Sequence, residues 1–253
     1  MKNEILEFAE KLNIEYIGIA PVMRYAELFE HLKSRQEKYG LSEFEEKDIE
    51  KRANPHLTYP WAKSIIVCLF PYYTGEDEDS NISKYARIPD YHRVAGEKLD
   101  KICRLINEKY GTYFFIGYIV TELELESDKP QDKECIKCGK CINACPGQAI
   151  DGEFHVDVNR CVSYITQLKT ITEEQRKILN NQEMVYGCDR CQDVCPYNVN
   201  AQKTPIEEFY KKRVTKLKKS DLETLTNREF KEKYQDFAFS WRGKGAILKN
   251  FDK

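Results

Sequence analysis

Apolar and polar positions along the first part of the chain follow two different periods, which predict helices and strands in turn. Apolar residues among the first twelve recur every three to four positions, so we expect an amphipathic helix there. The apolar runs at 15–22 and 61–73 predict buried strands, and Pro71 stops the second of them. Between these runs we expect residues 25–39 to form a charged helix and the polar residues 42–58 to form a loop.

The pattern changes again in the middle of the chain. Asp90 is suited to cap a helix that runs to about residue 109. The aromatic and β-branched residues of 112–125 predict a further strand. Because helices alternate with strands, we expect an α/β layer in the first half of the chain. From residue 201 onward the chain is lysine-rich, and we expect a short helical tail.

Eight of the ten cysteines fall into one arrangement in the second half of the chain. CIKCGKCINACP and CDRCQDVCP both place cysteines two residues apart and a last cysteine directly before a proline. This spacing is typical of proteins with two four-iron, four-sulfur clusters, in which the cysteine before the proline ligates the other cluster. That rule assigns one cluster to Cys135, Cys138, Cys141 and Cys195. It assigns the other cluster to Cys145, Cys161, Cys188 and Cys191.

Zinc sites and disulfides are the alternative uses of such cysteines. Structural zinc favours two separated pairs of ligands in a tetrahedral site. Disulfides need an oxidising compartment. Neither explains a compact run of four cysteines that ends in proline, so we expect iron–sulfur clusters and electron transfer.

Length and charge narrow the setting of the chain. It has 253 residues and a net charge of -2. No stretch is long and uncharged enough to cross a bilayer, and the amphipathic start of the chain is unlike a signal peptide. The many thiols fit a reducing compartment. We therefore expect a cytoplasmic protein that has no membrane contact.

A basic run follows the cysteine region. It consists of Lys211, Lys212, Arg213, Lys216, Lys218 and Lys219. Since the net charge is close to zero, any binding of nucleic acid would be local. Two interpretations stay open: contact with RNA phosphates, which would weaken steeply with salt, and a solvated helix face whose charge is diluted by residues such as Glu208 and Asp221.

Several longer stretches carry a family resemblance. These are LTYPWAKSIIV at 57–67, SKYARIPDYH at 83–92, GTYFFIGYIVTELELE at 111–126, CVSYIT at 161–166 and GCDRCQDVCPYN at 187–198. Together they resemble the epoxyqueuosine reductases, cobalamin-dependent enzymes that complete queuosine in tRNA. The reductive dehalogenases, which share cobalamin and two clusters, are similar more distantly.

The resemblance implies a mixed α+β and α/β architecture in three parts. A shortened α/β domain of the cobalamin-binding type is expected at 1–130, a ferredoxin-like domain with two 4Fe–4S clusters at 131–200, and a helical tail at 201–253. It also implies an enzyme that converts epoxyqueuosine to queuosine in tRNA. Its electrons would come from an external donor such as flavodoxin or ferredoxin, and an acid would supply a proton as water leaves.

Four further residues are candidates for cofactor contact through the same resemblance. Ser163 and Tyr164 occupy the segment that approaches the corrin in the family, although a loop beside a cluster would also use them for hydrogen bonds. Tyr91 and Arg52 match family positions near the cofactor or its phosphate, although an arginine in a charged loop is often only solvated.

The chain departs from the family between KICRLI at 101–106 and NEKYGTYFF at 107–115. Several dozen residues of the family's middle are absent there, including the strand with the acidic proton donor and part of the cobalamin pocket. The catalytic acid is therefore unknown, and Asp90 and Asp189 are the nearest candidates in the sequence. Three interpretations remain: an enzyme that recruits another acid, a non-catalytic two-cluster electron carrier that has lost cobalamin, and an incomplete or rearranged gene.

Overall fold

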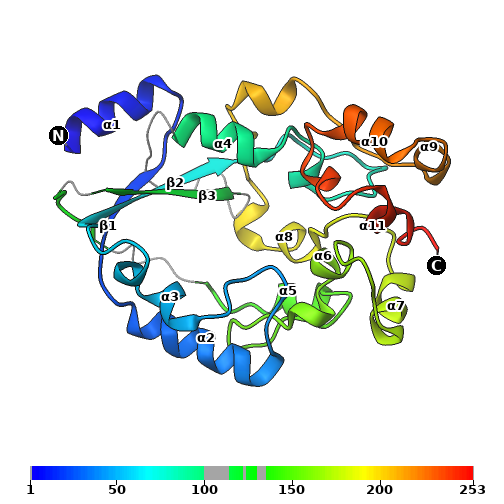
Figure 1. Ribbon diagram of the computed structural model, residues 1–253, viewed down its shortest axis with the longest axis horizontal. Coiled ribbons are helices and arrows are strands. Elements are labelled where there is room, and N and C mark those ends of the chain that lie inside the picture. Colours follow the sequence, from blue (N-terminus) through cyan, green and yellow to red (C-terminus); the bar gives the residue numbers. More distant parts are fainter. Residues whose placement is uncertain (1, 100–113, 122–123, 130–134, 253) are drawn as a thin grey trace. The chain divides into compact units, whose positions relative to one another are not determined.

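The computed structural model describes residues 2–99, 114–121, 124–129 and 135–252 (Figure 1). The chain divides into two compact units. The first unit comprises Met1–Pro71, Ala95–Glu108 and Phe114–Cys138. The second comprises Tyr72–Val94, Lys109–Tyr113 and Gly139–Lys253.

A three-stranded antiparallel sheet organises the first unit, in the order β1-β2-β3. The strands are β1 (Ile17–Pro21), β2 (Ser64–Pro71) and β3 (Phe114–Thr121). Ile17 is aligned with Cys68 across the first pair of strands, and Ser64 with Thr121 across the second. Three strands are thus confirmed within the three predicted runs. The alternation of helices with strands indicated a mixed fold correctly. The α/β layer that it predicted implies a mostly parallel sheet, however, and the described strands are antiparallel, so that part of the prediction is wrong.

Helices connect the strands of this unit. The helices α2 (Ala26–Tyr39) and α3 (Ile49–Ala53) and the 3-10 turn η1 (Pro55–Leu57) lie between β1 and β2, while α1 (Lys2–Lys11) precedes β1. The helix α3 lies where we expected a loop. It forms because the Asp48 side chain caps it, accepting a hydrogen bond from the Lys51 amide at 3.2 Å.

The outer edge of β1 is covered by the segment around Asp128. The Ile19 amide donates to Asp128 Oδ2 at 2.7 Å, and the Asp128 amide donates to the Ile19 carbonyl at 2.9 Å. Lys2 Nζ donates to Asp128 Oδ1 at 2.7 Å. These bonds satisfy part of an edge that would otherwise expose unpaired backbone groups.

The helix α4 (Tyr91–Leu99) begins directly after Asp90, as expected, and its predicted continuation lies outside the described residues. Its last residue packs against β3. A Cβ added to Gly117 would lie only 2.7 Å from Leu99 Cδ1, so the close approach of helix and strand depends on glycine.

Short helices and turns build the second unit. The α-helices are α5 (Lys140–Ala144), α6 (Val162–Ile165), α7 (Glu173–Asn180), α8 (Arg190–Asp193), α9 (Lys219–Glu223), α10 (Asn227–Tyr234) and α11 (Lys244–Leu248). The 3-10 turns are η2 (Lys84–Ala86), η4 (Val158–Arg160), η5 (Pro196–Asn198), η6 (Glu207–Tyr210) and η7 (Ala238–Ser240). Capping boxes at Thr172 and Thr226 start α7 and α10.

One hydrophobic core joins distant parts of the second unit. Ile82 and Tyr186 are buried in it together with Phe230, Phe239 and Ile247 from the end of the chain. The C-terminal helices therefore pack on the same core as the segment that leads into the second cysteine motif. Among the described residues, no helix has both the length and the apolar character needed to cross a membrane.

Candidate metal centre

The two cysteine motifs fold into short helices whose ends present the thiols. Cys141 lies in α5 and Cys145 ends it, while Cys191 lies in α8. Cys145 and Cys195 each precede a proline and have extended backbones, because proline disfavours the helical conformation in the residue before it. The helices α5 and α8 pack against each other, so the two motifs are neighbours in the fold (Figure 1).

Four thiols of the second unit influence one another directly. Burial, together with the charges of Cys161, Asp189 and Cys145, raises the pKa of Cys188 to about 11, although a hydrogen bond from the Arg190 amide opposes the shift. Burial also raises the pKa of Cys191 to about 12, with added contributions from Cys188, Cys161 and Cys145. The structure therefore brings together the four cysteines that the crossing rule assigns to one cluster.

This set of thiols fits an iron–sulfur cluster by its chemistry. Half-buried thiols that disfavour one another's charge need a cationic centre before they ionise together. All eight cysteines of the motifs are free thiols. Of the other predicted group, Cys135 and Cys138 belong to the first unit and are exposed, whereas Cys141 and Cys195 belong to the second. That these four hold one cluster stays a prediction.

Ser163 and Tyr164 lie within α6 (Val162–Ile165), two and three residues after Cys161. Burial raises the pKa of the Cys161 thiol, and the backbone amides of Tyr164 and Ser163 oppose this by donating hydrogen bonds to its sulfur. The Ser163 carbonyl also accepts hydrogen bonds from Thr166 Oγ1 at 3.0 Å and Gln167 Nε2 at 2.9 Å. The structure thus shows both residues supporting a ligand cysteine, and contact with cobalamin stays a prediction.

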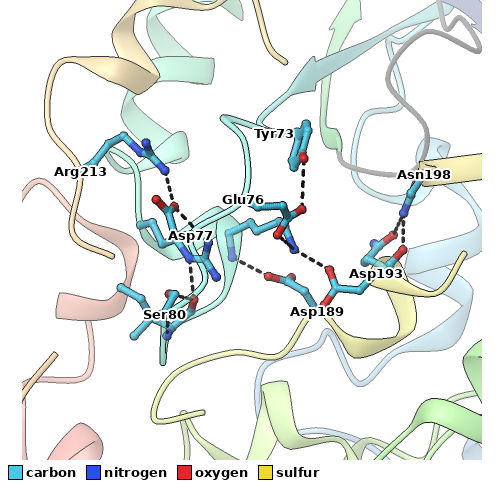
Figure 2. A network of polar contacts seen from close by, with 12 residues as sticks. Tyr73, Glu76, Asp77, Ser80, Asp189, Asp193, Asn198 and Arg213 are labelled. Carbon is cyan, nitrogen blue, oxygen red and sulfur yellow. Dashed lines mark hydrogen bonds and ion pairs between the residues drawn. The ribbon is translucent and has the colours of Figure 1, made fainter. Parts of the chain in front are cut away.

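Asp189 is a buried carboxylate within the second cysteine motif (Figure 2). Its Oδ2 accepts a hydrogen bond from the Lys84 amide at 2.6 Å. Burial raises its pKa, while that hydrogen bond and the Lys84 charge act in the opposite direction. Asp189 therefore anchors the motif to the segment 81–87, and its role as the acid stays a prediction.

Asp90 faces a histidine that was not predicted to be a site residue. Its Oδ1 accepts a hydrogen bond from the His92 amide at 2.9 Å and lies 2.8 Å from His92 Nδ1. The His92 side chain is 72% exposed, and its ring stacks on Tyr91 with centroids 4.1 Å apart. Burial, followed by the charge of Asp90, raises the pKa of Tyr91. An aspartate two residues before a histidine at a helix start was the available signal for this pair.

Arg52 lines a cavity of the first unit. The cavity measures about 560 Å³ and is bordered by α2, α3 and one face of β2 and β3. Its walls include the side chains of Tyr25, Lys51, Arg52, Tyr59, Ile65 and Tyr118. Arg52 Nη1 donates to Glu45 Oε2 at 2.6 Å, so this arginine is held in an ion pair and is not merely solvated.

Comparison with known proteins identifies the family. Residues 134–198 match the 4Fe-4S double cluster binding domain, and residues 52–120 match the model "Epoxyqueuosine reductase QueG, DUF1730". An epoxyqueuosine reductase of Bacillus cereus is 30% identical over 306 residues, which cover 99% of this chain and 78% of that protein. One of Bacillus subtilis is 31% identical over 309 residues, covering 99% and 77%. The chain belongs to the epoxyqueuosine reductase family.

Solved epoxyqueuosine reductases share the fold of this family member. A selenomethionine-labelled enzyme has a TM-score of 0.87 and 28% identity, covering 98% of this chain and 79% of that one. Another, solved with a tRNA-Tyr epoxyqueuosine-modified tRNA stem loop, has a TM-score of 0.84 with 28% identity and the same coverage. The predicted family and the predicted 4Fe–4S clusters are thereby confirmed.

The comparisons also bear on the segment missing from this epoxyqueuosine reductase. The Bacillus cereus alignment extends over 306 residues, more than the 253 of this chain, so that relative has residues without a counterpart here. A Bacillus subtilis enzyme, 29% identical with a TM-score of 0.82, was solved with the catalytic loop that carries its aspartate swung out of the active site. The aspartate of that relative thus belongs to a loop, and that this chain lacks a counterpart of it stays a prediction.

Proposed function

We propose that this chain is an oxidoreductase that reduces epoxyqueuosine to queuosine in tRNA. The observation that carries the proposal is the match of almost the whole chain to epoxyqueuosine reductases, together with the intact set of eight thiols. The reaction consumes two electrons and two protons, opens both carbon–oxygen bonds of the epoxide, and releases an alkene and water. The electrons come from an external donor such as flavodoxin or ferredoxin.

We assign residues 1–130 to a shortened cobalamin domain, 131–200 to a ferredoxin-like domain with two clusters, and 201–253 to a helical tail. Within the first unit, the cavity beside Arg52 supports cofactor binding. Its aromatic and aliphatic walls suit planar apolar groups, and Lys51 supplies positive charge for a phosphate, whereas the charge of Arg52 is largely taken up by Glu45. A volume of about 560 Å³ fits part of so large a cofactor, such as its nucleotide portion. Bound cobalamin would supply the electron-rich metal for opening the carbon–oxygen bond.

We assign the proton donor to His92, oriented by Asp90. A carboxylate beside one ring nitrogen of a histidine fixes the tautomer and the orientation of the ring. The other ring nitrogen belongs to a side chain that is 72% exposed, which leaves it open to a substrate. Asp189 is a weaker candidate because its oxygen already accepts the Lys84 amide and the residue is only 7% exposed.

Binding to tRNA is supported by the relative solved with a modified stem loop more than by the basic run. Four of the six basic side chains in that run are paired with acidic residues of the chain. The pairs are Lys212 with Asp236, Arg213 with Asp77, Lys216 with Asp79, and Lys219 with Asp252. These pairs reduce the positive charge offered to phosphates. The eight free thiols of the two cysteine motifs support our assignment of the protein to the cytoplasm, whereas the disulfide of Cys68 does not.

The test is conversion of epoxyqueuosine in precursor tRNA by anaerobically reconstituted protein supplied with cobalamin and a reductant. We expect queuosine in the digested tRNA by mass spectrometry and a corrin absorbance that remains with the protein. His92→Gln should lower turnover by about 10²- to 10⁴-fold, the usual contribution of a general acid. His31→Gln, which changes a histidine in α2, is the matched control. If the protein holds its full iron and sulfide but neither retains corrin nor forms queuosine, the result would support the alternative that the chain is a non-catalytic electron carrier.

The aspartates are tested in the same assay. Asp90→Asn should lower turnover less than His92→Gln does, because the ring remains but loses its orienting carboxylate. Asp189→Asn should leave the proton step intact wherever iron content is normal. Unimpaired turnover in His92→Gln would remove His92 from the mechanism, and loss in Asp189→Asn at full iron would transfer the role to Asp189.

A further inference from the structure

A buried lysine joins the segment before α4 to the second cysteine motif. Lys84, in η2, is only 5% exposed. Its Nζ lies 2.5 Å from Asp193 Oδ1 and 3.4 Å from Glu76 Oε2. Its backbone amide donates to Asp189 Oδ2 at 2.6 Å. All four residues belong to the second unit, and the three carboxylates converge on one place in Figure 2.

The two aspartates that Lys84 contacts stand between cluster ligands. Asp189 lies between Cys188 and Cys191, directly before α8, and Asp193 lies between Cys191 and Cys195. The neighbouring backbone adds further bonds. The Val185 amide donates to the Asn81 carbonyl at 2.7 Å, and the Ser83 amide donates to the Tyr186 carbonyl at 2.8 Å. The cysteine loop is therefore fixed from outside at several points, and Lys84 brings a positive charge to one of them.

A charge in this position acts on any redox centre that the loop holds. Each electron that a cluster accepts adds one negative charge to it. A fixed positive charge nearby stabilises the reduced form, and the effect is larger where little water is present. Burying the ammonium group is tolerated because carboxylates pair with it. Removing the ammonium would take a positive partner from Asp193, which lies between two ligands, and from Glu76, while the backbone amide of residue 84 would still bind Asp189.

We propose that Lys84 is a positioning residue of the metal centre, which fixes the loop of Cys188, Cys191 and Cys195 and raises the reduction potential of the cluster held by Cys188 and Cys191. The proposal rests on the clusters of the proposed function but needs neither cobalamin nor tRNA. It assigns to this segment a role in electron supply that its sequence does not indicate. The residue acts on the ligands through Asp189 and Asp193, to which it is bound directly.

The test is a redox titration of the reconstituted full chain, in which electron paramagnetic resonance measures the reduced clusters. Iron and sulfide are measured for every variant. Lys84→Met should lower the midpoint potential of one of the two clusters. At a fixed potential, the ratio of the reduced to the oxidised form of that cluster should fall about tenfold. For a one-electron couple that is a midpoint about 59 mV lower. Lys84→Arg keeps the charge and should restore the original midpoint. Lys216→Met, which removes an exposed lysine paired with Asp79 at 3.2 Å, is the matched control and should shift neither cluster.

The sign of the shift separates an electrostatic role from a merely structural one. Asp193→Asn removes a negative charge from the same pair and should move the midpoint upward, opposite to Lys84→Met. Shifts in the same direction in both variants, or an unchanged midpoint in Lys84→Met at full iron, would overturn the proposal. If Lys84→Met loses iron while Lys216→Met keeps it, the positioning role is supported. The effect of the charge on the potential is then decided by the other two variants: Asp193→Asn should raise the midpoint potential and Lys84→Arg should leave it unchanged. A chain that titrates in this way but forms no queuosine would refute only the proposed enzyme activity.

Discussion

Replacing Gly187 with alanine should destabilise the second unit, because this glycine lets the cysteine motif approach the segment 81–87. Gly187 has a φ of 71°, in the left-handed region that side chains disfavour. A Cβ at this position would lie 1.9 Å from Ser83 Oγ and 2.6 Å from Ser83 Cβ. Ser83 is fully buried and has little room to move. Conformation and overlap therefore both oppose the substitution.

The two contributions can be separated with a second glycine. A residue with a Cβ in the left-handed region costs about 1–2 kcal/mol, and overpacking of a buried site adds about 1–3 kcal/mol. Gly187→Ala should therefore lower the free energy of unfolding by about 2–5 kcal/mol. Gly243 has a φ of 80°, and a Cβ added there would meet no neighbouring atom within 4 Å. Gly243→Ala should therefore cost only the conformational contribution of about 1–2 kcal/mol.

Urea unfolding under argon, followed by tryptophan fluorescence, measures this difference. Trp241 Nε1 donates to the Tyr186 hydroxyl at 3.0 Å, beside the substituted glycine. The chain has two tryptophans, so a Trp61→Phe background leaves Trp241 as the reporter. With a slope of about 2 kcal/mol per molar urea, the overlap should lower the midpoint of Gly187→Ala by about 0.5–1.5 M below that of Gly243→Ala. Adding Ser83→Gly should recover that difference, and equal midpoints in the two alanine variants would refute the reasoning.

Three further predictions concern the clusters and the pH dependence of stability. Cys138→Ser and Cys191→Ser should each lower iron per chain by about half, and unchanged iron in both would contradict the ligand assignment. Glu45→Gln should cost about 3–5 kcal/mol in urea unfolding, because the buried Arg35 loses its carboxylate partner. Burial acts to raise the pKa of Glu45, but the hydrogen bond from Arg35 acts in the opposite direction and the pKa is lowered. The stability that Glu45 contributes is therefore complete above pH 4.5 and is lost as the pH falls through the lowered pKa. An identical loss of stability in acid for Glu45→Gln would contradict this. Burial lowers the pKa of Lys249 to about 8, so the contribution of Lys249 to stability should rise between pH 8 and 10.5, where the unfolded chain still binds the proton; the difference in urea midpoint between the unaltered chain and Lys249→Met should change across that range, and a constant difference would contradict it.

The elements that could be predicted from the sequence are those set by local pattern. The strands β1 and β2 follow from continuous apolar runs, and α2 follows from helical spacing between them. Their antiparallel pairing could not be predicted, because it depends on which edges meet in space. The helix α3 was missed because one capping bond from Asp48 outweighs a polar sequence that indicated a loop.

The same limit applies to the candidate site. Cysteine spacing indicated the ligands because the cluster itself imposes it. The partners of those ligands come from far away in the chain: Lys84 is 105 residues from Asp189 and 109 from Asp193. The basic run was ambiguous for the same reason, since Arg213 is paired with Asp77 across 136 residues. Charge counted along a sequence cannot show such pairs.

The segment from Asn81 to His92 explains how a shortened member of this family could keep its chemistry. Its first half holds the cysteine loop through Lys84, and its second half presents His92, which lies eight residues after Lys84 and is oriented by Asp90. Electron supply and proton supply are thus assigned to one continuous stretch within the second unit. We predict from the resemblance that the residues lost from the family's middle fall between 101–106 and 107–115, outside this stretch. A deletion at that place would remove the family's acid without altering residues 81–92, so the loss of the acid would not by itself imply the loss of the reaction.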